Sequence, residues 1–433
     1  MEQNYHLYYG LGKKEYFSLP AGWVPIHFAE TKEEASQSSV EQMTQDALSA
    51  PAGAPALKEL ISGAKRIAVI VDDWTRPTPV AGILQVLLPY LVSNGFSREN
   101  VVIVVALGTH VAMTREELEG RLGKDVMSRY KVVQHNAWQS DLVPIALPGD
   151  GRVVRINPEV ARAEVKIGIS SILPHPMAGY GGGPKILMPG VSNFEFVREH
   201  HMRHTIHPRA TAGLAEGNPF HEDCFRAARA IGLDFSINCL YNQHGQVARI
   251  LGGSLEAAFA AAVEACLEKL GARFEEKVDV TITSTYPHTH GHQFCKGLSA
   301  PDVVTKGTGV ILMVVPTVTP VTGEFVSSFN LIRERSGNNC VEYVKEAMSK
   351  GMPFLPEKPL EFNMAMSALI LRPQIRTILV SSTISQDEAR TMGLEYAPSV
   401  GEGLRLLERV YPSARVAIFP SGGLIIPIPA WKQ

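Results

Sequence analysis

Histidine and arginine side chains in this sequence stand in loops where acid–base chemistry and anion binding are possible. His110 and His175 each follow a short apolar run. An imidazole has a reference pKa of about 6.5, so such a pair is suited to general acid–base catalysis near neutral pH. Arg76 precedes a Pro-Thr-Pro turn, and a rigidly held guanidinium suits a carboxylate ligand. Asp73, three residues earlier, is placed to orient either that arginine or a histidine.

A glycine-rich loop, GYGGGPKILMPGV, runs from Gly179 to Val191. Its three consecutive glycines, Gly181, Gly182 and Gly183, lead through a proline to Lys185. The spacing fits neither a P-loop, which requires Ser or Thr after the lysine, nor a dinucleotide fingerprint. A lysine beside glycine residues, which have no side chains, can bind a phosphate or form a covalent bond as an amine nucleophile. The sequence of the loop alone does not distinguish these two functions.

Histidines also cluster in two places at spacings that metal sites use. His200 and His204 stand four residues apart, as do positions on one face of a helix, with His201 and His207 nearby. A second cluster comprises His288, His290 and His292. Either set is a candidate for nickel or zinc.

Alternating strand and helix signals predict an α/β architecture with largely parallel sheets. The expected strands are 66–71, 100–106, 163–169, 278–283, 309–315, 377–381 and 415–419, and the expected helices include 114–122, 219–231, 254–270 and 400–410. Residues 5–19 resemble a hairpin. In such sheets ligands bind at the carboxyl ends of the strands, and four of the loops that follow strands carry the residues above or the second histidine cluster. We therefore expect one site built from these loops.

The chain of 433 residues is predicted to form two α/β domains with the active site in the cleft between them. The first domain is expected over residues 1–272, with 411–433 returning to it, and the second over 278–410. A formal net charge of −2 argues against nucleic acid as a partner, and the apolar runs are too short to cross a membrane. Five scattered cysteines and a polar start favour a cytoplasmic protein.

Taken together, the motifs resemble those of the nickel-dependent lactate racemase family, whose members racemise or epimerise 2-hydroxy acids with a nickel-pincer nucleotide. The resemblance covers most of the chain. It rests on Asp73-Trp74-Thr75-Arg76-Pro77, Gly108-Thr109-His110, Pro174-His175, Gly182-Gly183-Pro184-Lys185, His201 and Gln293-Phe294-Cys295-Lys296-Gly297.

The resemblance implies a role for each matching residue. Lys185 corresponds to the lysine joined to the cofactor, a Ni(II) pyridinium-3-thioamide-5-thiocarboxylic acid mononucleotide that Gly181, Gly182 and Gly183 would let approach the backbone. His201 corresponds to the nickel ligand, with His200 as the alternative, and His110 and His175 to the acid–base pair. Arg76 corresponds to the residue that holds the substrate carboxylate, Asp73 to its support or that of a histidine, and Gln293, Lys296 and His292 to residues that reach the substrate or cofactor. The implied partners are a small 2-hydroxy acid and the enzymes that make the cofactor.

Some positions depart from the family pattern. Pro184 replaces an arginine, His200 an asparagine and His292 a tyrosine, and no tryptophan lies between Trp138 and Trp431. These changes concern the pocket more than the reacting groups, so we expect a substrate larger or more polar than lactate.

Three other functions are compatible with some of these residues. A nickel- or zinc-binding protein without racemase activity needs the histidines alone and leaves Arg76, Asp73 and the glycine loop without a role. A zinc hydrolase lacks a carboxylate base at HExxH spacing. An NAD-dependent dehydrogenase lacks a complete glycine fingerprint.

Overall fold

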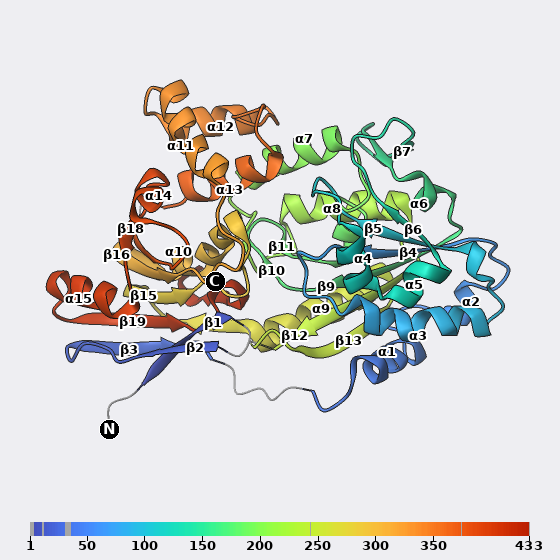
Figure 1. Ribbon diagram of the computed structural model, residues 1–433, viewed down its shortest axis with the longest axis horizontal. Coiled ribbons are helices and arrows are strands. Elements are labelled where there is room, and N and C mark those ends of the chain that lie inside the picture. Colours follow the sequence, from blue (N-terminus) through green and yellow to red (C-terminus); the bar gives the residue numbers. More distant parts are fainter. Residues whose placement is uncertain (1–3, 11–12, 31–35, 243, 374, 433) are drawn as a thin grey trace.

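The computed structural model describes residues 4–10, 13–30, 36–242, 244–373 and 375–432, which form two six-stranded sheets lying side by side (Figure 1). The first sheet has the order β13 (Val247–Gly253), β12 (Phe235–Tyr241), β9 (Val165–Ser171), β4 (Ile67–Asp72), β5 (Val101–Ala106) and β6 (Lys131–Gln134). The second has the order β18 (Glu395–Ala397), β17 (Arg376–Val380), β16 (Thr305–Val314), β15 (Val278–Ser284), β19 (Ala414–Phe419) and β3 (Trp23–Phe28). Neighbouring strands are parallel except β12 and β13, which confirms the predicted fold class.

Helices cover both faces of each sheet, because the strands are apolar on both sides. Those around the first sheet are α1 (Val40–Ser49), α2 (Leu57–Leu60), α3 (Val80–Ser93), α4 (Arg115–Leu122), α5 (Lys124–Arg129), α6 (Pro158–Arg162), α7 (Phe194–Thr205), α8 (Pro219–Ile231) and α9 (Leu255–Leu270). Those around the second are α10 (Ser299–Val304), α11 (Gly323–Ser336), α12 (Cys340–Ser349), α13 (Leu360–Ile370), α14 (Gln386–Thr391) and α15 (Val400–Val410). In the described part of the chain, no helix has both the length and the apolar character that crossing a membrane requires.

The predicted helix starts coincide with side-chain caps. Thr114 and Glu117 form a capping box at α4, where each side chain bonds the other residue's backbone amide. At α8 the Asn218 side chain accepts from a backbone N–H, and Pro219 occupies the first turn, where its missing N–H costs nothing. Ser254 caps α9 in the same way. These local signals explain why the helices begin where the sequence indicates.

The strands β3 and β19 belong to the second sheet, which differs from the prediction, whereas Leu424 and Ile426, after β19, pack with Phe259 of the first domain as the predicted return implies. The strand β19, expected to return to the first sheet, lies instead between β15 and β3. The hairpin predicted over residues 5–19 is present as β1 (Tyr5–Gly10) and β2 (Lys13–Phe17), and it packs on the same sheet; residues 11 and 12 lie outside the described part. The reason is that Trp23 and Val416, like Val280, bury apolar surface in the core of this sheet. We therefore propose two domains, one around each sheet, with residues 5–28 assigned to the second.

Short two-stranded ribbons complete the fold. They are β7 (Val143–Ala146) with β8 (Val153–Ile156), β10 (Pro174–His175) with β11 (Gly179–Tyr180), and β14 (Gly271–Phe274) with β20 (Ile426–Pro429). The ribbon β14–β20 occupies the predicted boundary segment 271–277 and joins it to the end of the chain. Short 3-10 helices, among them η2 (Gly183–Ile186) and η3 (Gly291–Leu298), follow β11 and β15.

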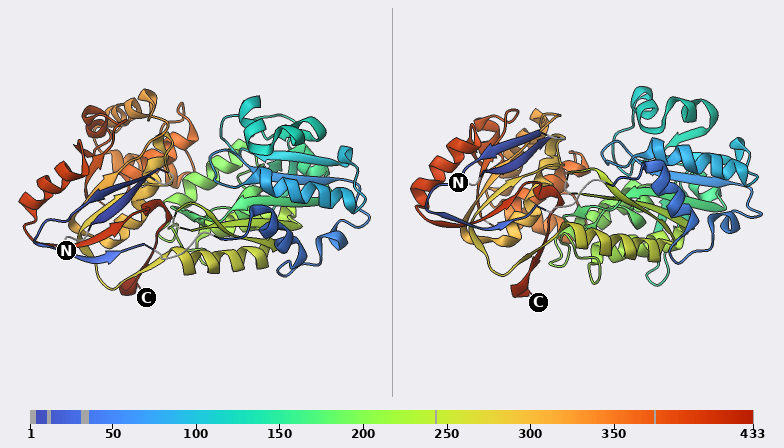
Figure 2. Two further views of the ribbon diagram at one scale, coloured as in Figure 1. Left: turned by 60° about the horizontal axis from the view of Figure 1, so that its bottom comes forward. Right: turned by 90° about the horizontal axis from the view of Figure 1, so that it is seen from below.

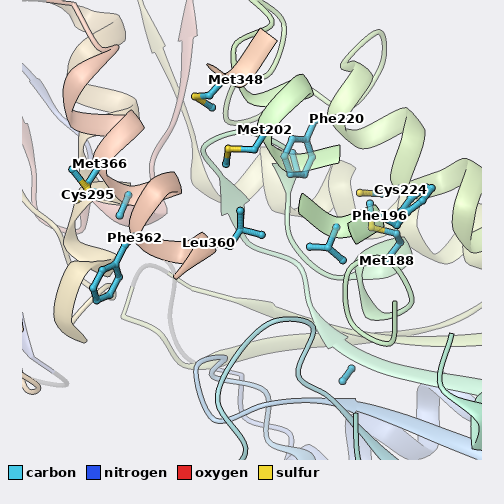
Figure 3. Packing of buried hydrophobic residues seen from close by; sticks show 14 of the residues in the cluster. Met188, Phe196, Met202, Phe220, Cys224, Cys295, Met348, Leu360, Phe362 and Met366 are labelled. Atoms are coloured by element: carbon cyan, nitrogen blue, oxygen red, sulfur yellow. The ribbon is translucent and has the colours of Figure 1, made fainter. Parts of the chain in front are cut away.

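A continuous apolar cluster joins the two sheets. Figure 3 shows Leu360 and Phe362 of α13 on one side, and Met202 of α7 and Phe220 of α8 on the other. Both views in Figure 2 show the two groups of elements side by side along the long axis of the molecule. Because the same buried cluster includes side chains from both groups, it fixes how the two sheets face each other across the site.

Candidate active site

A cavity of about 1130 Å³ lies between the two sheets. Its lining includes most of the residues that the sequence singles out: Asp73, Arg76, His110, His175, Gly181, Gly182, Lys185, His201, His292, Gln293 and Lys296. Gly183 and His200 are buried behind the lining. The structure therefore brings the predicted residues to one place.

The cavity forms where parallel strands end. β4 ends at Asp72, β5 at Ala106 and β9 at Ser171, and each is followed by a loop that contributes a lining side chain. β15 of the second sheet ends at Ser284, and the chain then reaches η3. Because these loops lie at the carboxyl ends of their strands, residues far apart in sequence converge on one cavity.

Asp73 orients His110 rather than Arg76. The Oδ2 atom of Asp73 lies 2.5 Å from Nδ1 of His110, and its other oxygen accepts from the backbone N–H of Thr75 at 2.8 Å. Burial disfavours the Asp73 carboxylate, but the hydrogen bond from His110 and the charges of His110 and Arg76 outweigh burial and hold its pKa below the ordinary value. The ionised carboxylate must accept, so Nδ1 of His110 carries a proton and its Nε2 is left as an acceptor when the ring is neutral.

The hydrogen bonds of His175 are the reverse of those of His110. Its Nδ1 atom accepts from the backbone N–H groups of Met177 at 3.3 Å and Ala178 at 3.1 Å. Burial lowers the pKa of His175 well below 6.5, and the charges of Lys185 and Lys296 lower it further. The ring is therefore neutral with its proton on Nε2, which makes it a donor.

The glycine loop packs tightly against the first domain. A Cβ atom on Gly182 would lie 2.5 Å from the carbonyl oxygen of Ser171, and one on Gly183 would lie 2.2 Å from the ring of Phe259. Both glycines also have positive φ, 68° and 53°. Close packing against protein therefore requires these two glycines, a reason that the sequence did not indicate.

The loop presents Lys185 to the cavity. Its Nζ atom lies 4.8 Å from the centre of the Phe220 ring, and among the described residues it makes no hydrogen bond or ion pair. Burial lowers the pKa of this amine, which favours its neutral, nucleophilic form. Pro184 stands at the start of η2 and leaves the Lys185 backbone N–H bonded to the Gly182 carbonyl at 3.1 Å.

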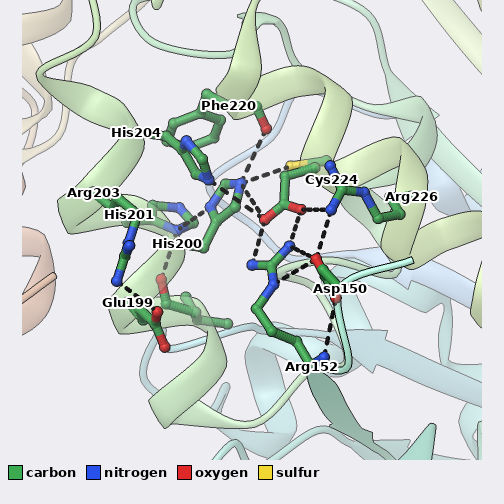
Figure 4. A network of polar contacts seen from close by, with 12 residues as sticks. Asp150, Arg152, Glu199, His200, His201, Arg203, His204, Phe220, Cys224 and Arg226 are labelled. Carbon is green, nitrogen blue, oxygen red and sulfur yellow. Dashed lines mark hydrogen bonds and ion pairs between the residues drawn. The ribbon is translucent and has the colours of Figure 1, made fainter. Parts of the chain in front are cut away.

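The histidines of α7 are drawn in Figure 4. Nδ1 of His201 lies 2.9 Å from the carbonyl oxygen of Val197 and 3.2 Å from Nδ1 of His200. Nε2 of His200 lies 3.0 Å from the carbonyl oxygen of Phe220. Both ring nitrogens of His200 therefore face protein atoms. His201 lines the cavity, and among the described residues only its Nδ1 is engaged, which leaves Nε2 to act as a ligand.

The predicted pairing of His200 with His204 is present and includes a carboxylate. Ligand atoms of His200, His204 and Asp223 all lie within 4.8 Å of one another. Asp223, however, also binds the Arg152 guanidinium, with Nη1 to Oδ2 at 2.9 Å. His207 is not in this group, and the second cluster, His288, His290 and His292, makes no such group among the described residues.

The second sheet contributes η3 to the cavity. Burial lowers the pKa of Lys296 to about 7, with further contributions from the charges of Arg76 and Lys185. His292 packs between Phe325 and Phe362, with ring centres 5.4 and 5.3 Å away. Its Nε2 is buried without a hydrogen-bond partner.

Two features of the site escaped the sequence analysis. Glu361, in the first turn of α13, lines the cavity. Asp72 is buried below the site, where it pairs with Arg121 and accepts from Thr78 at 2.5 Å. The two consecutive acidic residues Asp72 and Asp73 could have indicated a second carboxylate near the site. No local sequence pattern indicates that Glu361 lines the cavity.

Comparisons with known proteins point to one family. Residues 9–213 match the family model described as the lactate racemase N-terminal domain. The chain is 26% identical over 396 residues to the lactate racemase of Thermoanaerobacterium thermosaccharolyticum, covering 90% of each chain. It is 28% identical over 405 residues to the lactate racemase of Lactiplantibacillus plantarum, covering 90% of this chain and 91% of the relative.

Solved structures share the fold. The lactate racemase apoprotein from T. thermosaccharolyticum superposes with a TM-score of 0.83 at 24% identity, covering 98% of this chain and 100% of that one. A protein from Thermotoga maritima superposes with a TM-score of 0.64 at 19% identity, covering 92% of this chain and 100% of that one. Residues 9–213 therefore match the N-terminal domain of the lactate racemase family, and the chain as a whole is similar to lactate racemases over nine-tenths of its length.

Proposed function

We propose that this protein racemises or epimerises a 2-hydroxy acid. The observation that carries the proposal is the pair His110 and His175, one an acceptor and one a donor in their neutral forms, in a cavity that also contains Arg76 and Lys296. Inverting a 2-hydroxy acid requires a proton acceptor and donor for the hydroxyl group and a cation for the carboxylate. The lactate racemases to which the chain is similar support the same reaction class.

The residues present fit the nickel-pincer nucleotide. Lys185 offers a buried amine without a hydrogen-bond partner among the described residues, which suits covalent attachment. His201 offers a free Nε2, and imidazole is a suitable nickel ligand, so His201 is favoured over His200. When bound, the nucleotide would supply a hydride acceptor, which the reaction needs because the C2–H bond of a 2-hydroxy acid is too weak an acid for simple deprotonation.

In this proposal each residue of the chain has a defined task. Arg76 and Lys296 bind the substrate carboxylate and fix its orientation. His110, held by the ionised Asp73, removes the hydroxyl proton of one enantiomer at Nε2, and His175 serves the hydroxyl of the other. The rigid hydrogen bonds of both rings keep their reactive atoms in place during the reaction.

One observation favours a second candidate function. The group His200, His204 and Asp223 has the ligand types of a divalent-metal site, so a nickel- or zinc-binding protein without racemase activity is the alternative. Against this alternative, Arg152 already neutralises Asp223, and a cation there would lie beside a guanidinium.

The test is production of the chain together with the enzymes that synthesise the nickel-pincer nucleotide. We expect an added mass that maps to Lys185, about one nickel per chain, and loss of optical activity from a single enantiomer of a 2-hydroxy acid. A Lys185→Arg variant keeps a basic side chain but lacks the amine needed for attachment, and it should gain no mass. An unmodified Lys185 beside a known lactate racemase loaded in the same host would refute the cofactor assignment, and reversible nickel binding that is lost in His204→Gln would support the alternative.

A further inference from the structure

The loop 72–78, between β4 and α3, is held by a side chain that has no part in the proposed reaction. This side chain is Arg121, which lies in the last turn of α4, outside the cavity lining, and is 11% exposed. Its Nε atom donates to the carbonyl of Asp72 at 3.3 Å, and its Nη1 atom donates to the carbonyls of Arg76 and Thr78 at 2.9 and 2.8 Å. Its Nη2 atom donates to the carboxylate of Asp72. One guanidinium therefore bonds this loop at three points along its length.

The loop has few main-chain hydrogen bonds of its own. Pro77 and Pro79 have no N–H to donate, and α3 begins only after Pro79. Within the loop the N–H of Arg76 reaches the carbonyl of Asp73 at 3.2 Å. A carbonyl removed from water needs a donor, and Arg121 supplies one where the backbone does not. The conformation of the loop thus depends on a side chain from another element.

Asp72 fixes the same loop to the first sheet. Its Oδ2 atom accepts from Oγ1 of Thr78 at 2.5 Å, and this hydroxyl also lies 2.5 Å from Oγ of Ser171, which lies 2.7 Å from the hydroxyl of Tyr241. Because Thr78 gives its one proton to Asp72, Ser171 donates to Thr78 and Tyr241 donates to Ser171. The loop is therefore tied to β9 and β12 through Asp72, and to α4 through Arg121.

The guanidinium of Arg76 depends on the position of this loop. Its Nη1 atom donates to Oγ1 of Thr75 at 2.9 Å, and among the described residues Arg76 makes no ion pair. The backbone N–H of Thr75 donates to Asp73 at 2.8 Å, within the same loop. Arg76 therefore takes its place from its own loop, and Arg121 bonds the carbonyl of Arg76 itself. A misplacement of about 1 Å at a reacting group can cost about 10²-fold in rate, so this support matters to a ligand.

A purely structural ion pair is the competing explanation for Arg121 and Asp72. Such a pair accounts for one of the hydrogen bonds of Arg121 and leaves those to the three carbonyls without a role. It would also be satisfied by a lysine. A guanidinium, in contrast, has five N–H groups in a fixed plane and can reach the carboxylate and the carbonyls together.

We propose that Arg121 is a positioning residue that places the guanidinium of Arg76 and so determines the affinity for the substrate carboxylate. This inference rests on the proposed function, which assigns the carboxylate to Arg76. Arg121 does not line the cavity, so it acts on the ligand through Arg76. Its removal should weaken the binding of a carboxylate, and this effect should disappear once the side chain of Arg76 is absent.

The test is a double-mutant cycle between Arg121→Lys and Arg76→Met. The dissociation constant of pyruvate from the full cofactor-free chain is measured by calorimetry. We expect Arg121→Lys to weaken binding roughly tenfold, because an ammonium group cannot span the loop, and to change it by less than about twofold in Arg76→Met. If Arg76→Met abolishes binding, Arg76→Lys replaces it in the cycle. Arg115, on the same helix, is 87% exposed and pairs with Glu119, so Arg115→Lys is the matched control and should leave the affinity unchanged.

A second variant covers the case in which Arg121→Lys does not fold. Asp72→Asn combined with Arg121→Met removes both charges, so that no lone ion is left buried. Circular dichroism and urea unfolding establish that each variant is folded. We expect the same loss of pyruvate affinity in this double variant, and the same dependence of the loss on Arg76.

The possible outcomes separate the positioning role from the proposed reaction. A folded Arg121 variant that binds pyruvate as tightly as the wild type overturns the role, and so does an equal loss with and without the side chain of Arg76. Failure of both Arg121 variants to fold, or no binding of pyruvate by the wild type, overturns it as well. A loss that depends on Arg76, without inversion of any 2-hydroxy acid by a correctly loaded chain, supports the positioning role and refutes the proposed reaction.

Discussion

The unusual basicity of Lys296 gives a quantitative prediction for ligand binding. Burial, Arg76 and Lys185 lower its pKa from 10.5 to about 7. A shift of this size corresponds to about 5 kcal/mol of destabilisation of the charged form, at 1.36 kcal/mol per pKa unit. A carboxylate bound beside Lys296 stabilises the ammonium form and raises the pKa again. Binding of an acid should therefore be accompanied by uptake of a proton.

The direction of the pH dependence of binding follows from the lowered pKa of Lys296. Above pH 7 the free protein holds Lys296 mainly as a neutral amine, so each binding event must first protonate it. At pH 8.5 uptake should approach one proton, and affinity should fall about tenfold for each pH unit above 7. A 2-keto acid such as pyruvate is a suitable ligand, because the proposed reaction passes through a planar keto acid.

Calorimetric titration of the cofactor-free chain in two buffers with different heats of ionisation measures this uptake directly. We expect a buffer-dependent heat in the wild type and its loss in Lys296→Met. Lys306, which pairs with Asp279 at 2.7 Å away from the cavity lining, supplies the control Lys306→Met, in which the uptake should persist. Heat that is independent of the buffer, or uptake that survives in Lys296→Met, would show that the ligand does not contact this amine.

Three further perturbations test the architecture. In Asp73→Asn the loaded chain should lose roughly 10²–10⁴-fold in kcat, because an amide cannot hold the His110 tautomer, and a loss below tenfold in a chiral assay would contradict that role. Gly183→Ala should lower the free energy of unfolding in urea by about 1–3 kcal/mol, because its Cβ has no room, whereas Gly120→Ala in open space on α4 should not destabilise. His135 has its pKa lowered to about 4 by burial, so the unfolded chain binds more protons below pH 6.5. Stability in urea should fall by up to about 3 kcal/mol between pH 6.5 and 4, less steeply in His135→Gln.

The sequence predicted those parts of the site that depend only on where each strand ends and which residues follow it. Residues after β4, β5, β9 and β15 were expected together because parallel strands end at one edge, and the structure confirms this expectation. The sequence alone does not determine whether Asp73 supports Arg76 or His110, since both lie within reach of its loop. Only the folded chain shows that the carboxylate accepts from His110.

The parts that escaped prediction depend on packing between distant segments. β3 and β19 have ordinary strand sequences, and nothing within them specifies which sheet they join. That choice follows from apolar surfaces that meet only in the folded chain. Glu361 is one of many acidic residues at a helix start, a position that normally reflects the helix dipole. Its place on the cavity wall depends on how α13 packs against α7 across the two domains.

The charges in the cavity explain why the binding of an anion and the protonation of Lys296 are linked. Arg76, Lys185 and Lys296 line one cavity and repel one another, so each cation makes the others harder to maintain. Asp73 does not relieve this repulsion fully, because its carboxylate is committed to His110. Lys296, with its pKa lowered to about 7, is therefore partly neutral until an anion arrives, which makes positive charge available when a carboxylate is present. A carboxylate is thus the ligand feature that this distribution of charge stabilises.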